Sequence, residues 1–201
     1  PCRRNRRRAV SLLRLFVALD FPAEMRKALA RAGRDCSPVL PGVRWTRPET
    51  LHLTLKFLGD TGAERVPEVA GALRAALASR SAGRFMLAGL GVFPNVRRPS
   101  VVWAGISVGA DWVAGLAAAV DGALVPLGFP PETRPFQPHV TLGRLRPPAR
   151  WSAEAAKRLF AESAERVFGE VAVDAVVLYA STLARDGASH EPLARLPLCR
   201  D

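Results

Sequence analysis

Two of the three histidines in this chain lie in nearly identical stretches of sequence. Residues 51–58 read LHLTLKFL and residues 138–145 read PHVTLGRL, so His52 and His139 each begin a His-x-Thr-Leu motif. Imidazole titrates near neutral pH, so one histidine can donate a proton while a second one accepts a proton. Such a pair suits in-line displacement at phosphorus, which needs a base at the attacking oxygen and an acid at the leaving oxygen.

The spacing within each motif predicts where its side chains point. Side chains on a β-strand alternate between the two faces, so His52 shares a face with Thr54, and His139 shares a face with Thr141. The apolar residues between them predict that the opposite face of each strand is buried. Threonine hydroxyls beside the histidines can hold the non-bridging oxygens of a phosphate. Strict alternation also places Lys56 on the histidine face, where it either meets phosphate or stands in solvent.

The two motifs are separated by a little under half of the chain, which predicts a duplicated half-domain. Helical and extended segments alternate along the sequence, and several neighbouring strands have only short connections. We therefore expect an α+β fold of two similar lobes related by a pseudo-two-fold axis. Each lobe should be a mostly antiparallel sheet with packed helices, and the active-site cleft should lie between the lobes.

Apolar periodicity and turn residues predict the individual elements. Helices are expected over residues 22–33, 64–78, 111–124 and 152–161, with Gly33 ending the first and Ser152 capping the last. Strands are expected over residues 14–21, 43–45, 51–58, 84–92, 100–108, 139–145, 171–183 and 191–198.

The charge balance favours a nucleic-acid partner. The chain has 201 residues and a formal net charge of +11, with 29 basic residues against 18 acidic ones, and nearly all the basic residues are arginine. The planar guanidinium group binds phosphate well. Much of the surplus lies within residues 3–8, so residues 1–13 are expected to form a disordered basic extension. Residues 14–201 are expected to form a single bilobal domain.

Other features of the sequence limit the cofactors, partners and compartment. The three cysteines are widely spaced and form no C-x-x-C motif, which favours a reducing cytoplasm. No carboxylate cluster or third metal ligand accompanies the histidines, so we expect a reaction without metal or cofactor. No apolar run approaches the ~18 residues that would span a bilayer, so no membrane partner is expected.

Five stretches of the sequence resemble the bacterial and archaeal RNA 2′,3′-cyclic phosphodiesterase family, also called 2′-5′ RNA ligases. That family belongs to the two-histidine phosphoesterase superfamily. The stretches are RLFVALDFP (residues 14–22), VRWTRPETLHLTLKFLGD (43–60), VVWAGI (101–106), RPFQPHVTLGRLR (134–146) and LYASTLARDG (178–187). They occur in the order typical of the family, and the resemblance extends from about residue 14 to the end of the chain.

The resemblance implies an enzyme that opens a 2′,3′-cyclic phosphate at an RNA 3′ end and leaves a 2′-phosphate. His52 would be the proton donor to the departing 3′ oxygen, and His139 would be the proton acceptor that activates water. Thr54 and Thr141 would hold the phosphate, and Arg144 would stabilise charge on phosphorus. Strict alternation from His139 places Arg144 on the opposite face, so this role requires a bend in the strand, or the end of the strand, to bring Arg144 to the cleft.

Weaker candidates and alternative functions follow from the same residues. Trp45 and Phe93 are candidates for stacking on an RNA base, the alternative being that they belong to the core. His190 stands where the family often has a tyrosine, and we interpret it as structural or exposed. One alternative function is the reverse reaction, 2′-5′ ligation of cyclic-phosphate and 5′-hydroxyl ends such as tRNA halves. Another is a non-catalytic RNA-binding module. In each case the protein is expected to be a monomer.

Overall fold

The computed structural model describes residues 11–145, 151–184 and 187–200. The first strand, β1 (Leu12–Leu19), includes the last two residues of the predicted basic extension. Leu12 and Leu13 therefore belong to the sheet and not to a tail. Residues 1–10, which carry the arginine cluster, lie outside the described residues.

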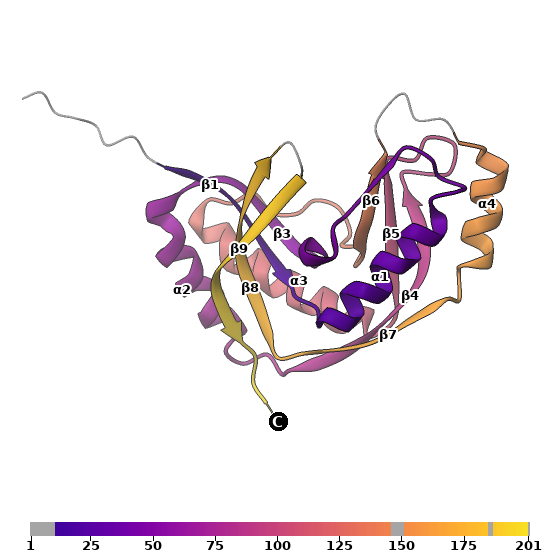
Figure 1. Ribbon diagram of the computed structural model, residues 1–201. Helices are drawn as coiled ribbons and strands as arrows, with labels where there is room; N and C mark the ends of the chain where they lie inside the picture. The colour runs from indigo at the N-terminus through magenta and orange to yellow at the C-terminus, as the bar shows by residue number, and fades with distance from the viewer. Residues whose placement is uncertain (1–10, 146–150, 185–186, 201) are drawn as a thin grey trace, which may run out of the picture.

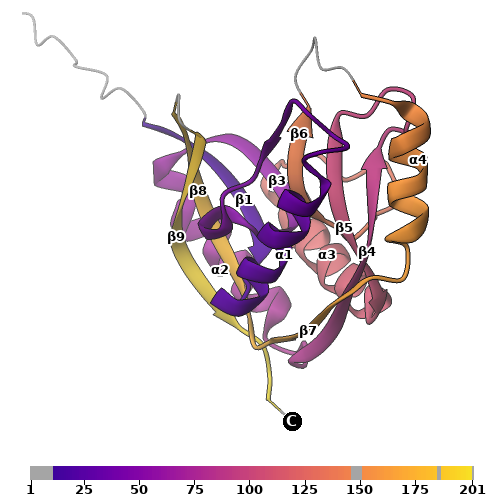
Figure 2. The same ribbon diagram turned by 45° about the vertical axis from the view of Figure 1, so that its right-hand side comes forward.

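A single curled sheet contains all the named strands, and the pairings between them are antiparallel (Figures 1 and 2). Its order is β7-β4-β5-β6-β3-β1-β8-β9, with β2 beside β6. After β1, the strands are β2 (Val43–Trp45), β3 (Leu53–Gly62), β4 (Gly83–Phe93), β5 (Val101–Val108), β6 (Val140–Leu145), β7 (Val167–Val173), β8 (Ala175–Ala184) and β9 (Gly187–Pro197). Together with the helices, this sheet confirms the predicted α+β class.

The sheet divides at its middle into two lobes, each a run of neighbouring strands that begins with a motif strand. The first lobe is β3-β1-β8-β9 and the second lobe is β6-β5-β4-β7, each counted outward from the middle. The lobes meet where Leu53 pairs with Val140, the pair that joins β3 to β6. The two predicted lobes are therefore halves of one continuous sheet, and each motif strand lies at the inner edge of its lobe.

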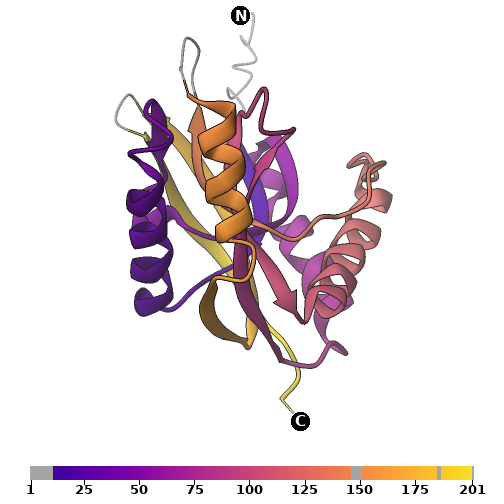
Figure 3. The same ribbon diagram turned by 90° about the vertical axis from the view of Figure 1, so that its right-hand side faces the viewer.

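Two of the named helices pack mainly against the lobe that does not contain the strand before them in the sequence. The helices are α1 (Ala23–Cys36), α2 (Val66–Leu77), α3 (Ala110–Leu124) and α4 (Ala153–Glu162), with 3-10 turns η1 (Pro48–Thr50), η2 (Ala63–Arg65) and η3 (Val125–Leu127). Helix α1 contacts β6 and β7 of the second lobe, whereas α3 contacts β3 of the first lobe. Figure 3 shows α1 and α3 on opposite sides of the strands.

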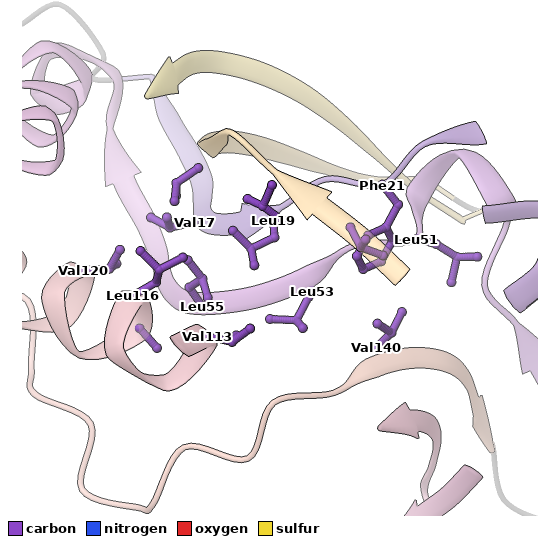
Figure 4. Packing of buried hydrophobic residues seen from close by; sticks show 14 of the residues in the cluster. Val17, Leu19, Phe21, Leu51, Leu53, Leu55, Val113, Leu116, Val120 and Val140 are labelled. Carbon is purple, nitrogen blue, oxygen red and sulfur yellow. The ribbon is translucent and has the colours of Figure 1, made fainter. Parts of the chain in front are cut away.

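The core beneath the first motif forms where α3 packs against β3 (Figure 4). Leu53 and Leu55 of β3 and Val113 and Leu116 of α3 are all buried. Burial of each such side chain contributes about 1.5–3 kcal/mol, so this contact fixes the strand that carries the motif. The stretch Ala110–Leu127 is long and apolar enough to cross a membrane by length and composition, and here its first fifteen residues form this core helix.

Two expectations about helix ends have different outcomes. Gly33 does not end α1, which continues to Cys36. A Cβ atom at Gly33 would lie 2.9 Å from the ring of Trp45, so the glycine makes room for a packed tryptophan. The predicted cap of α4 is confirmed, because the backbone N–H of Ala155 donates to Ser152 Oγ at 3.2 Å.

Candidate active site

The pairing of the two motif strands brings the histidines and threonines together. Leu53 pairs with Val140 in an antiparallel register, so His52 is in register with Thr141, and Thr54 is in register with His139. Each histidine lies one residue before its strand begins. We call the face that carries these four residues the site face, and the opposite face, which packs on the helices, the core face.

Backbone carbonyls fix the tautomer of both histidines in the same way. The Nδ1–H of His52 donates to the carbonyl oxygen of Thr50 at 2.7 Å, and the Nδ1–H of His139 donates to that of Gln137 at 2.7 Å. Because a carbonyl can only accept, the proton of each neutral ring is on Nδ1, and Nε2 is left for chemistry. His52 Nε2 lies 3.1 Å from Thr54 Oγ1, which donates to it.

Aromatic rings orient His52 more closely than they orient His139. The His52 ring centroid lies 4.7 Å from that of Phe16 and 5.1 Å from that of His190, the latter with the rings nearly perpendicular. The ring of Tyr179 stacks on that of Phe16, with the ring centroids 5.2 Å apart. His139 has the ring of Phe93 edge-on at 5.1 Å. Two aromatic contacts therefore position the predicted proton donor, and one positions the predicted acceptor.

Burial makes both motif histidines neutral in the unliganded protein. Burial lowers the pKa of His52 from 6.5 to about 4, although the hydrogen bond to the Thr50 carbonyl acts in the opposite direction. Burial also lowers the pKa of His139, against the effect of the Gln137 carbonyl. A neutral His139 is ready to accept a proton from water. His52 can donate only after it gains a proton, which a bound phosphate anion favours by its negative charge.

The low pKa of His52 predicts a loss of stability in acid. The folded state resists protonation of His52 between pH 6.5 and about pH 4, whereas the unfolded chain accepts the proton, so stability is full above pH 6.5 and falls below it. Relative to a His52→Gln variant, the wild-type protein should lose about 2 kcal/mol more between about pH 7 and about pH 4.5. Urea unfolding at the two pH values measures this difference, and equal losses in the two proteins would refute it.

A β-bulge brings Arg144 to the site face. Gly143 pairs with Val102 of β5, but the next pair joins Thr141 to Trp103, so Leu142 is an extra residue in β6. The extra residue reverses the alternation beyond it. Arg144 is therefore exposed on the same face as Thr141, which supplies the bend that its predicted role requires.

A second bulge contradicts the expectation for Lys56. Leu55 is an extra residue in β3, because Lys56 pairs with Val17 whereas Thr54 pairs with Ala18. Lys56 therefore points to the core face, where its side chain is 2% exposed. Its ammonium group donates to Asp121 Oδ1 at 2.5 Å and to the Pro130 carbonyl at 2.7 Å. It is neither a solvated lysine nor a phosphate ligand on the site face.

The two predicted stacking residues lie in different surroundings. Phe93 contacts His139 and also lies 5.2 Å from Trp103, so it belongs to the site. Trp45 instead packs against the buried core, and its ring lies close to Gly33 and Gly143. The structure therefore favours the core alternative for Trp45 and leaves Phe93 as a candidate for base stacking.

Sequence reasoning missed several residues around His52. A cavity of about 220 Å³ beside this histidine is lined by Asp20, Arg26, Glu49, Thr50, Leu51, His52, Tyr179, His190 and Pro192. His190 is part of the site and is not merely structural or exposed, since its ring contacts that of His52. The strands predicted over residues 171–183 and 191–198 were the available signal, because their antiparallel pairing places His190 opposite Ser181 and close to Tyr179.

The described residues include no group of three or more histidine, cysteine or acidic side chains that could hold a metal ion. The predicted site residues on the site face supply imidazole, hydroxyl and guanidinium groups. These groups can donate and accept protons and bind an anion. The site is therefore equipped for acid–base chemistry on a phosphate ester.

A sheet of this topology with one His-x-Thr motif from each lobe defines a two-histidine phosphoesterase. The LigT-like phosphoesterase family profile matches residues 19–103 and 106–189, and the chain belongs to this family.

Relatives and solved structures agree with this assignment. The RNA 2′,3′-cyclic phosphodiesterase of Aquifex aeolicus is 30% identical over 89% of this chain and 93% of its own length. That of Archaeoglobus fulgidus is 32% identical over 90% and 98%. A crystal structure of a Thermus thermophilus protein has a TM-score of 0.76 at 29% identity, covering 92% of this chain and 98% of that one. Escherichia coli LigT complexed with 3′-AMP has a TM-score of 0.72 at 27% identity, covering 94% and 99%.

Proposed function

We propose that this protein hydrolyses RNA 2′,3′-cyclic phosphodiester ends to 2′-phosphomonoesters by acid–base catalysis with His52 and His139. The observation that carries this function is the register of β3 and β6, which gathers both histidines and both threonines on one face. The fixed Nδ1 protons leave one reactive nitrogen on each ring. Relatives named RNA 2′,3′-cyclic phosphodiesterase, similar over most of the chain, support the choice of substrate.

The two histidines divide the proton transfers. His139 Nε2 accepts a proton from water as the water oxygen attacks phosphorus. The bond from phosphorus to the 3′ oxygen breaks, and protonated His52 donates from Nε2 to that oxygen. The 2′ oxygen keeps the phosphate, and each histidine then exchanges its proton with solvent to restore the starting state.

Hydroxyl and guanidinium groups hold the phosphate between the histidines. Thr54 and Thr141 are half-buried on the site face and can donate to the non-bridging oxygens. Arg144 is exposed at the same face and can neutralise the charge that develops on them. When phosphate binds, Thr54 can donate to phosphate instead of to His52, which frees His52 Nε2 to carry the transferable proton.

Product identification tests this function directly. We expect an oligonucleotide with a 2′,3′-cyclic phosphate end to yield a 2′-phosphate, and tRNA halves with such ends to be opened too. A chelator should change the rate by less than twofold, because the side chains supply both proton transfers. A 3′-phosphate product would reverse the assignment of the leaving oxygen, and strong inhibition by the chelator would show a metal requirement. Adding RNA with a 5′-hydroxyl end in the same assay detects ligation.

The proposal includes a monomer that acts in the cytoplasm. Cys36 and Cys199 are free thiols in the structure, which supports a reducing compartment. Both motifs belong to one chain, so one protomer supplies the paired histidines and threonines.

A further inference from the structure

Each motif strand has one bulge after its histidine. The residue five positions after the histidine therefore returns to the site face in both lobes, and these two residues occupy equivalent positions. In the second lobe the extra Leu142 returns Arg144 to the site face. In the first lobe the extra Leu55 does the same for Phe57, which pairs with Phe16. The counterpart of a phosphate-binding arginine is thus a phenylalanine. Its side chain is 58% exposed, and the hydrolysis of one phosphate gives it no role.

Phe57 lies beyond His52 along the site face. Its ring centroid lies 6.0 Å from that of Phe16, and Phe16 in turn lies 4.7 Å from the ring of His52. Phe16 is only 2% exposed and is stacked on Tyr179, so the support beneath Phe57 is rigid. Exposed aromatic rings beside a path for single-stranded nucleic acid are typical stacking surfaces for bases.

An unpaired guanidinium group lies near this ring. Arg14 and Phe16 alternate along β1 and pair with Ser181 and Tyr179 of β8 without a register shift, so Arg14 also lies on the site face. The Arg14 side chain is exposed and, among the described residues, makes no hydrogen bond or ion pair, even with Asp60 opposite it on β3. It is therefore available to a phosphate group.

The cavity on the other side of His52 does not suit a phosphate chain. Its lining has two carboxylates, Asp20 and Glu49, and only Arg26 is a fixed cation. Arg26 is paired with Asp20, which leaves the exposed carboxylate of Glu49 to repel an anion. The terminal nucleoside must lie near His52, because the leaving 3′ oxygen belongs to it. The RNA chain that precedes this nucleoside is then directed toward Phe57 and Arg14.

We propose that Phe57 and Arg14 bind the nucleotide that precedes the terminal one, with its base stacked on Phe57 and its connecting phosphate paired with Arg14. This inference rests on the proposed function and specifies its substrate as an oligoribonucleotide, in preference to a mononucleotide. It also assigns different tasks to the equivalent positions of the two lobes. Arg144 serves the reacting phosphate, and Phe57 serves a neighbouring base.

Matched substrates of one and two nucleotides test this assignment. The measured quantity is the ratio of kcat/KM for a dinucleotide with a cyclic phosphate end to that for the corresponding cyclic mononucleotide. We expect Phe57→Ala to lower this ratio about tenfold, and Phe57→Trp to retain it, because tryptophan also stacks on bases. Arg14→Gln should lower the ratio about threefold at low salt and less at high salt, because salt screens exposed charges. Val125→Ala, an exposed apolar residue in η3, serves as the control with an unchanged ratio.

The outcomes separate this inference from the function on which it rests. No hydrolysis of either substrate by the wild-type protein would refute the proposed function. Hydrolysis of both, with the same ratio in wild type and Phe57→Ala, would refute the stacking site and leave the function intact. If Phe57→Ala fails to fold, the Phe57→Trp variant still decides the matter. Its added tryptophan emission should be quenched by a dinucleotide 2′-phosphate, and unchanged emission would overturn the inference.

Discussion

His52→Ala and His139→Ala should each lower kcat by about 10²–10⁴-fold while the protein remains folded. Each variant removes one of the two proton transfers. Both rings lie on the site face and outside the main hydrophobic core, so thermal unfolding at neutral pH should change little. Rates with a cyclic-phosphate oligonucleotide measure the loss. Near wild-type turnover in either variant would refute the acid–base assignment.

A substrate with a good leaving group can distinguish the two roles. A nitrophenyl phosphodiester releases an oxygen that needs little help from an acid, whereas the attacking water still needs a base. His52→Ala should therefore lose much less activity on this substrate than on a cyclic phosphate, and His139→Ala should lose activity on both. The opposite pattern would exchange the donor and the acceptor.

Asp121→Ala should lower the free energy of unfolding by about 3 kcal/mol, the largest effect on stability that we expect outside the apolar core. The ammonium group of Lys56 is buried on the core face and is paired with this carboxylate. Removal of Asp121 leaves the charge with the Pro130 carbonyl as its remaining partner. Urea unfolding at neutral pH measures the loss.

Two further variants show whether burial causes this effect. Glu24→Ala removes the partner of Lys27, but both side chains are more than half exposed, so the cost should be below about 0.5 kcal/mol. Replacing Lys56 by methionine together with Asp121 by leucine should recover most of the lost stability, because no unpaired charge remains. A similar loss in Glu24→Ala and Asp121→Ala would contradict the interpretation.

The alternation of side chains along each motif strand predicted correctly which residues share the site face at its centre. The same alternation gave the wrong face for residues a few positions further along the strand. His52, Thr54, His139 and Thr141 share the site face as the two-residue period requires. The bulges at Leu55 and Leu142 then reverse the period. Each bulge is defined by pairing with a neighbouring strand, β1 or β5, which is distant in sequence. A pattern within one strand carries no information about that register.

The surroundings of His52 depended on contacts that no local pattern contains. Phe16, Tyr179 and His190 come from three different strands, and their rings meet only because β1, β8 and β9 lie side by side. Trp45 failed as a stacking candidate for a similar reason, because Gly33 of α1 and Gly143 of β6 make room for its ring. The helices were easier to predict, since their apolar periodicity is a local property.

The exchange of α1 and α3 between the lobes couples the unfolding of one lobe to that of the other. Helix α1 follows β1 of the first lobe in the sequence but packs on strands of the second lobe. Helix α3 follows β5 of the second lobe but packs mainly on β3 of the first lobe. Neither lobe can keep its core when the other one melts, so the chain should unfold in one transition. A protease cut between α2 and β4 would leave two fragments that still hold each other, with the paired histidines still assembled.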